Sequence, residues 1–172
     1  MNDSPDMIDG ISELNAMPVS VLLERRPANN PWLDVVWQAT GIAIGGNTSA
    51  DPSLAVREEG GCALYLVGGL QVRLFADECE SYYYNLVSDS PKAYVIAHVD
   101  EPGARPTPFR VSMSFDEAHA YLEGEDEIYA VDVPAELYRW TEAFVIANYF
   151  PEKKRKRKLV DWRADGADSA TS

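Results

Sequence analysis

The sequence predicts an α+β fold: a mainly antiparallel β-sheet, or a partly open barrel, of about six strands with two C-terminal helices. Segments rich in β-branched and aromatic residues come first in the 172-residue chain. The connections between them read as hairpins rather than helical crossovers, which favours antiparallel pairing. Helix signals appear only towards the C-terminus. One domain is expected over residues 17–151.

Two strands are expected at the start of this domain. Residues 19–24 alternate Val19, Val21 and Leu23 with more polar neighbours, which is typical of a half-buried strand. The prolines at both ends of 27–31 predict a loop, because proline cannot extend a sheet ladder. A second strand region spans 32–44 and stops at a glycine-rich turn signal. Residues 48–61 then read as a long loop.

The middle of the chain predicts further strands. Gly68–Gly69 separates two β-rich runs and favours the positive φ angles of a tight hairpin turn. Residues 82–87 have the aromatic content of a strand, although a short helix remains an alternative. Strands are also expected at 93–99 and 109–113.

Two helices are expected after these strands. Ser114 and Glu117 have the spacing of a capping box, and Gly124 is placed to end that helix. Residues 134–149 start with a proline suited to a first helical turn. They carry a wide apolar stripe, which predicts burial on the sheet or against a partner.

Charge divides the chain into an acidic body and a basic segment. There are 15 Lys and Arg against 28 Asp and Glu, a formal net charge of −13. Residues 1–16 are expected to form a disordered acidic tail and 152–172 a disordered basic, then polar, tail. No apolar run approaches the roughly 18 to 20 residues of a membrane span, and no signal peptide is recognised. A soluble, cytoplasmic protein without membrane contact is therefore expected.

The basic run is a candidate contact for nucleic acid or an acidic partner. An acidic body opposes nucleic acid by its general field, so such contact would come from this run alone. The other interpretation is a solvated tail that folds back on the acidic body. The run consists of Lys153, Lys154, Arg155, Lys156, Arg157 and Lys158.

No metal, cofactor or catalytic residue is predicted. Cys62, Cys79, His98 and His119 lack the close pairing typical of zinc sites, and the thiols are expected to be reduced. His98 lies two residues before Asp100, as in half of a catalytic dyad, but no nucleophile elbow accompanies it.

A tyrosine-rich segment leaves a second function class open. In a strand, Tyr82 and Tyr84 would share one face. Together with Asn85 and His98 they could line the pocket of a small-molecule-binding protein or enzyme. Core packing is the competing interpretation.

Three stretches carry a family resemblance. They are Pro18–Pro27 with Asn30–Trp32 and Val36–Trp37, then Asp77–Leu86, then Val133–Glu136 through Trp140 and Phe144 to the basic run. Together they resemble a bacterial domain family of unknown function, members of which are often encoded beside molybdenum-dependent formate dehydrogenase. The resemblance implies an accessory role in maturation or assembly of such an oxidoreductase. It implies no catalytic residue.

The best candidate recognition site lies in the first of these stretches. Arginine offers planar donors and stacks on tryptophan, a combination common at protein interfaces. The alternative is structural, with Glu24 and an arginine fixing the following turn. The candidate partner-binding residues are Glu24, Arg25, Arg26, Trp32 and Trp37. A non-catalytic binding protein with a protein partner is the function expected from sequence.

Overall fold

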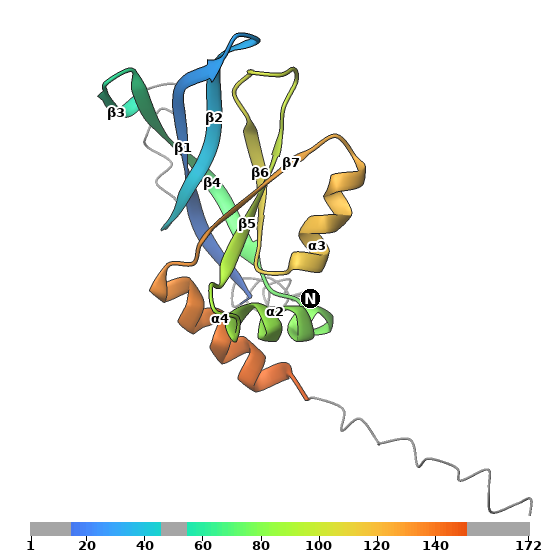
Figure 1. Cartoon of the computed structure of the whole chain (residues 1–172). Helices are drawn as coiled ribbons and strands as arrows, with labels where there is room; N and C mark the ends of the chain where they lie inside the picture. Colours follow the sequence, from blue (N-terminus) through green and yellow to red (C-terminus); the bar gives the residue numbers. More distant parts are fainter. Residues whose placement is uncertain (1–14, 46–54, 151–172) are drawn as a thin grey trace, which may run out of the picture.

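One mixed β-sheet, nearly closed on itself, forms the body of the protein (Figure 1). The computed structural model describes residues 15–45 and 55–150. The order of the strands in the sheet is β2-β1-β4-β6-β5-β7, and β3 pairs with β4. The strands are β1 (Ala16–Asn30), β2 (Leu33–Ile44), β3 (Ala55–Glu59), β4 (Cys62–Arg73), β5 (Lys92–His98), β6 (Thr107–Ser112) and β7 (Glu127–Asp132).

The sheet consists of two antiparallel halves joined by one parallel pair. β4 and β6 meet in parallel at a single register pair, Val72 with Val111. β3, β4, β1 and β2 form one half, and β6, β5 and β7 form the other. β2 and β7, the outermost strands in the order, lie close together and nearly close the sheet. The predicted α+β fold with a mainly antiparallel sheet is thus confirmed.

Three α-helices and two 3-10 turns complete the described part of the chain. The turn η1 (Ala76–Glu78) leads into α2 (Cys79–Leu86), and α3 (Phe115–Ala120) continues into η2 (Tyr121–Glu123). The longest helix is α4 (Ala135–Asn148). α2 and α4 pack together across one end of the sheet (Figure 1), where the Tyr138 hydroxyl donates to the Leu86 carbonyl oxygen at 3.2 Å.

The core lies between the sheet and these helices. Val19, Val21 and Leu23 are fully buried as predicted for the first strand, but Ser20 between them is also buried, so the alternation is incomplete there. Tyr82 of α2 and Leu137 of α4 enter the same core. The predicted helices at 114–124 and 134–149 are confirmed. Ser114 caps the first of them by accepting from the Glu117 backbone N–H, but the reciprocal bond of a capping box is not formed, because the Ser114 N–H donates to the Ser112 hydroxyl instead.

The strand predicted at residues 82–87 is wrong, because this segment belongs to α2. Its buried residues are Cys79, Tyr82, Asn85 and Leu86, which recur every three or four positions as on one face of a helix. Tyr83 and Tyr84 are exposed on the other face. The spacing of the buried residues therefore indicates a helix here, whereas the aromatic content of the segment had favoured a strand.

The hairpin predicted at Gly68–Gly69 is also wrong, because β4 runs through both glycines. The register with β1 shifts here, since Val19 pairs with Leu70 but Val21 pairs with Val67. Gly69 has a φ of 79°, which fits a β-bulge in which glycine adopts a left-handed conformation. The tight turn lies instead at Gly60 and Gly61, between β3 and β4, where both φ angles are positive.

Two expected loops contain strands. β1 continues through Pro27 to Asn30, where the chain was expected to form a loop. Pairing of β1 with β4 ends at Arg25, so beyond it one side of β1 has no neighbouring strand in the described structure and tolerates a proline. β3 lies within the predicted loop 48–61, and β7 was not predicted at all.

No helix among the described residues is long and apolar enough to cross a membrane.

Candidate functional site

The hairpin of β1 and β2 divides the predicted partner-binding residues between two faces of the sheet. Arg25 pairs with Trp37 across the hairpin, two positions beyond the pair Leu23 and Ala39. Residues two apart on a strand share a face. Arg25 and Trp37 therefore extend the inner, core-facing side of the sheet, at the end remote from α2 and α4 (Figure 1).

Glu24 and Arg26 lie on the outer face of the same strand. The Arg26 Nη2 atom donates to the Gln38 side-chain oxygen at 3.4 Å. Glu24 pairs in register with Gln38 on β2 and with Leu64 on β4. The structure thus brings Arg25 and Trp37 together, but it does not join Glu24 or Arg26 to them.

Trp32 lies in the turn between β1 and β2. Its residue surface is 86% exposed, the largest value among the large hydrophobic residues described. Its backbone N–H donates to the Asn30 side-chain oxygen at 2.9 Å, which fixes the turn. An indole ring held in water at the end of an ordered hairpin is available for contact with a partner.

Two further residues join Arg25 and Trp37 on the inner face. The rings of Trp37 and Tyr65 lie 5.4 Å apart between centroids. The Arg105 Cζ atom lies 4.6 Å from the Tyr65 centroid and 5.7 Å from that of Trp37, and the Arg25 Cζ atom lies 5.8 Å from Tyr65. We call these four residues the Arg25 cluster. Each cation–π contact is worth about 0.5–1 kcal/mol at such a site.

A cavity of about 280 Å³ lies beside the Arg25 cluster, between β2, β7 and the loop 99–106. Its lining is mostly apolar: Leu33, Val35, Val36, Trp37, Val99, Pro102, Gly103, Ala104, Pro106 and Tyr129, with Glu127 as the acidic member. Gly103 has a φ of 84°, and a Cβ atom there would lie 3.3 Å from Leu33 Cδ2. The loop therefore packs tightly on β2.

Burial raises the pKa of Tyr129, and the nearby Glu127 carboxylate raises it further. The phenol at the cavity wall is therefore neutral at physiological pH. The positive charge in this region comes from the guanidinium groups of the Arg25 cluster.

The four residues of the predicted tyrosine pocket do not share a pocket. Tyr82 is fully buried and its hydroxyl oxygen accepts from the Phe75 N–H at 3.0 Å. Burial is the main cause that raises the pKa of Tyr82. Tyr84 is 57% exposed on the opposite face of α2. Tyr82 thus serves the core rather than a ligand site.

Asn85, the third of these residues, is occupied by backbone partners. Its Nδ2 atom donates to the carbonyl oxygens of Lys92 at 2.7 Å and Met113 at 3.0 Å, and its Oδ1 atom accepts from the Lys92 N–H at 3.0 Å. These bonds join α2 to the start of β5 and the end of β6. Both N–H groups and the oxygen of this side-chain amide are therefore bonded to the backbone.

His98, the fourth residue, is exposed at the end of β5. Its Nε2 atom lies 3.1 Å from Asp100, as the sequence spacing predicts, and its Nδ1 atom lies 3.4 Å from Asp126. Half of the His98 side-chain surface faces solvent. The residue therefore takes part in a surface cluster with two carboxylates, away from Tyr82 and Asn85.

The cysteines and the second histidine lie in separate elements. Cys62 is exposed at the start of β4, and Cys79 is buried in α2, where burial and Asp77 raise its pKa. His119 lies on α3 with its ring 3.8 Å from that of Phe115. Within residues 15–45 and 55–150, no group of three or more His, Cys, Asp or Glu side chains is placed to hold a metal ion.

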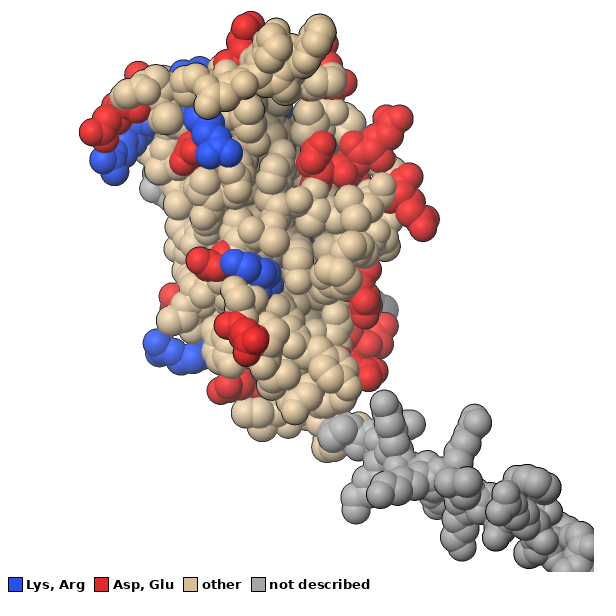
Figure 2. Space-filling view, viewed as in Figure 1, with Lys and Arg blue, Asp and Glu red and all other residues tan. Residues whose placement is uncertain are grey.

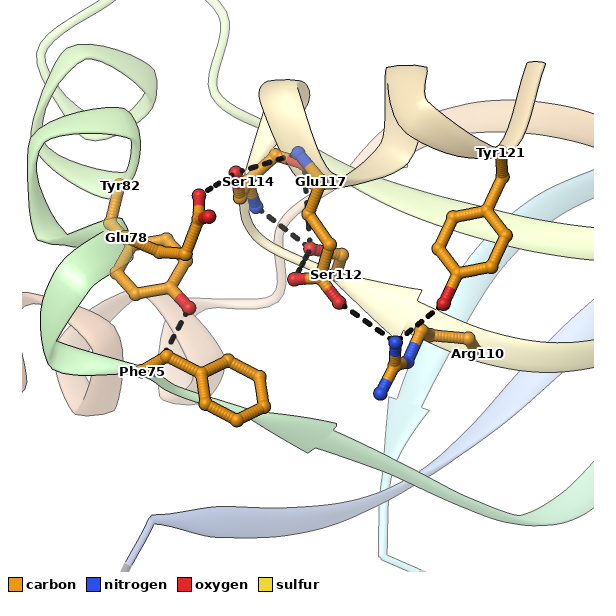
Figure 3. Close-up of polar contacts among 8 residues, drawn as sticks. All are labelled: Phe75, Glu78, Tyr82, Arg110, Ser112, Ser114, Glu117 and Tyr121. Carbon is orange, nitrogen blue, oxygen red and sulfur yellow. Dashed lines mark hydrogen bonds and ion pairs between the residues drawn. The ribbon is translucent and has the colours of Figure 1, made fainter. Parts of the chain in front are cut away.

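A polar network fastens α2 and α3 to β6 (Figure 3). Of its members, the sequence analysis singled out only Ser114 and Glu117. The Ser114 hydroxyl donates to a Glu78 carboxylate oxygen at 2.7 Å, and the Ser112 hydroxyl donates to Glu117 at 2.8 Å. Arg110 Nη1 lies 3.2 Å from the other Glu117 oxygen and also donates to the Tyr121 hydroxyl. Because its members satisfy one another, we assign this network a structural role.

Comparison with known proteins identifies the family. A family model described as "Protein of unknown function (DUF3305)" matches residues 18–158. The chain belongs to this family. The searches of curated proteins and of solved structures each found no match.

The match to the DUF3305 family confirms the predicted resemblance to a domain family of unknown function. Its range runs from the start of β1 past the end of α4, so it includes the Arg25 cluster and its cavity. It also includes the basic run Lys153–Lys158, which lies outside the described residues, as do most of the two expected tails. The contact expected for that run stays a prediction.

Proposed function

We propose that the protein is a cytoplasmic, non-catalytic accessory protein that binds a partner protein through the end of its sheet formed by the β1–β2 hairpin. The observation that carries this proposal is Trp32, which is 86% exposed in an ordered turn. Arg25 and the half-buried Trp37 lie on the adjoining inner face. Tryptophan and arginine dominate the binding energy of protein interfaces, because they bury large areas and offer directed donors.

We further propose that the partner is a subunit of a molybdenum-dependent formate dehydrogenase or a related oxidoreductase, and that binding assists its maturation or assembly. The support for this choice is the resemblance described from the sequence. The absence of a predicted catalytic constellation in the sequence agrees with an accessory role.

The partner-binding proposal is tested by affinity purification of the tagged, full-length protein from its native bacterium. We expect the wild type to recover a stable partner, identified by mass spectrometry. Trp32→Ala should lower recovery about tenfold or more, the loss expected at an interface hot spot. Ile146→Ala is the matched control, because Ile146 is 73% exposed on α4 at the other end of the molecule.

Two outcomes would contradict the proposal: recovery of no partner, or equal recovery by wild type and Trp32→Ala. The proposal that the partner is an oxidoreductase subunit has its own test, in which the gene is deleted and formate dehydrogenase activity and molybdenum content are measured. If both are unchanged while a Trp32-dependent partner is recovered, the protein binds a partner other than this oxidoreductase.

A further inference from the structure

An apolar surface is exposed at the end of the molecule that α2 and α4 form. On α4 the exposed side chains of Ala143, Ile146 and Ala147 recur as on one face of a helix. Ile146 is 73% exposed, and Phe150, which follows the helix, is 81% exposed. Large apolar side chains gathered in water gain free energy when another apolar surface covers them.

Tyrosines of α2 extend this surface. The ring of Tyr83 stacks on that of Tyr149, the residue that follows α4, with 5.3 Å between the centroids. Tyr84 lies edge-on to Tyr83 at 5.6 Å and is 57% exposed. We call Tyr83, Tyr84, Ile146, Tyr149 and Phe150 the tip patch. In Figure 1, α2 and α4 lie at the end of the molecule remote from the β1–β2 hairpin.

Positive charge follows the tip patch directly in the sequence. The basic run Lys153–Lys158 begins three residues after Phe150. Because an extended chain spans at most about 3.6 Å per residue, the first of these charges lies within about 11 Å of Phe150 and the last within about 29 Å. A surface that covers the tip patch therefore gains from carrying negative charge.

Acidic side chains border the tip patch and oppose such a surface. Glu142 is exposed one turn before Ile146 on α4. Burial raises the pKa of Tyr149, and the nearby Glu80 carboxylate raises it further. In Figure 2 acidic side chains also gather along one side of the molecule. The basic run outnumbers these two neighbours, and charges beyond a Debye length of about 8 Å are largely screened.

We infer that the tip patch and the basic run bind the surface of an anionic lipid bilayer, with Ile146 and Phe150 in the interface and the basic run against the lipid headgroups. Stable attachment of a peripheral protein takes two signals, such as an apolar group and a polybasic segment. This end of the chain supplies both. The expectation of no membrane contact rested on the lack of a spanning segment, which this mode of attachment does not need.

Two other occupants fit these observations less well. A second copy of the chain would bring two basic runs together, and like charges repel each other. The bases of single-stranded nucleic acid stack on open aromatic rings. The ring of Tyr83 is already stacked on Tyr149, and Ile146 offers no ring. A bilayer surface accepts both the aliphatic and the aromatic members of the tip patch.

Flotation of the full-length protein with lipid vesicles tests the inference. One set of vesicles contains equal amounts of phosphatidylcholine and phosphatidylglycerol, and the other contains phosphatidylcholine alone. We expect the wild type to float only with the first set and to be released by high salt, because salt screens the headgroup charge. Replacement of the whole basic run by glutamine should abolish flotation.

Ile146→Asp should lower the partition coefficient about tenfold or more, because a carboxylate is costly to place in an apolar layer. Val56→Asp is the matched control and should float as the wild type. It changes the charge equally at a branched side chain that is 55% exposed on β3, far from α4 (Figure 1). Urea unfolding shows whether both variants fold, and Phe150→Ser, which should also weaken flotation, tests the inference independently.

The inference is wrong if the wild type floats with neither set, if it floats equally with both, or if Ile146→Asp floats as the wild type does. Binding of a single-stranded oligonucleotide in place of the vesicles would also overturn it. These results are separable from the proposed function. Trp32→Ala should still float, and Ile146→Asp should still recover the partner, so failure of either experiment leaves the other conclusion standing.

Discussion

Single polar side chains connect the helices to the sheet. Ser114 is fully buried and acts in two directions, since its oxygen accepts from the Glu117 N–H at 3.1 Å and its hydroxyl donates to Glu78 at 2.7 Å (Figure 3). The first bond caps α3, and the second joins that cap to the turn that leads into α2. One hydroxyl therefore supports two helices at once.

Replacement of Ser114 by alanine is expected to lower the free energy of unfolding by about 1–2 kcal/mol, the cost of a lost N-cap. The partly buried Glu78 carboxylate loses a donor in the same variant. Urea unfolding measures the change. Ser90→Ala is the matched control, because Ser90 is exposed in the turn before β5, and its effect should stay within about 0.5 kcal/mol. Equal stability of both variants would contradict the role assigned to Ser114.

The buried phenol of Tyr82 predicts a loss of stability in alkali. Burial raises its pKa in the folded protein above the ordinary value of about 10. Above pH 10 the unfolded chain therefore loses this proton while the folded protein keeps it, and stability falls as pH rises, by up to about 1.4 kcal/mol per pH unit. Below that pH the contribution is fully present.

Urea unfolding between pH 8 and about pH 11 tests this prediction. Tyr82→Phe should lose stability less steeply than the wild type at the alkaline end, although it is less stable at neutral pH because the bond from the Phe75 N–H is lost. Burial also raises the pKa values of Tyr94 and Tyr129. These two residues contribute the same fall in stability with pH to the wild type and to Tyr82→Phe. Identical slopes would show that Tyr82 ionises equally in both states.

At the scale of elements, local sequence signals predicted α3 and α4 correctly. They gave wrong predictions where the structure of a segment depends on its pairing with a distant strand. The Ser114 and Glu117 spacing and the proline at 134 lie within single turns, so the sequence alone predicts α3 and α4. The glycine pair in β4 permits either a turn or a bulge. Which of these forms depends on β1, which is distant in sequence and holds β4 extended on both sides of the bulge.

The loop 99–106 offers a prediction on how an element shapes the cavity. Gly103→Ala forces a positive φ on alanine and places a Cβ atom 3.3 Å from Leu33 Cδ2. We expect a loss of about 1–2 kcal/mol in the free energy of unfolding, measured in urea. Gly124→Ala is the control, because Gly124 has a negative φ of −115° and its Cβ atom would meet its nearest neighbour at 3.8 Å. Equal losses would mean that the loop relaxes away from β2.

At the scale of the whole molecule, the candidate site combines residues that no local pattern connects. Arg25 and Trp37 were predicted from their stretch, and the hairpin brings them together. Tyr65 on β4 and Arg105 in the loop 99–106 contact this pair only because the sheet nearly closes on itself. Nothing near Arg105 in sequence indicates which strands its loop covers. The fold class was therefore predictable, and half of the Arg25 cluster was not.

The two thiols report on the integrity of the whole fold. Cys62 is exposed and Cys79 is 2% exposed, with a pKa raised by burial. A thiol reagent at neutral pH should therefore label one cysteine rapidly in the native protein and both in urea. Cys62→Ser should abolish the rapid phase. Rapid labelling of both thiols in the native protein would contradict the burial of α2 against the sheet.

The single parallel pair between Val72 and Val111 has a mechanical consequence for the molecule. With one register pair at this seam, we expect its amide protons to exchange faster than those within either antiparallel half. The cavity lies on the other side of the molecule and takes one wall from each half, with Trp37 on β2 and Tyr129 on β7. A ligand that fills this cavity would contact both halves of the sheet. We therefore expect amide hydrogen exchange to slow in both halves when it binds.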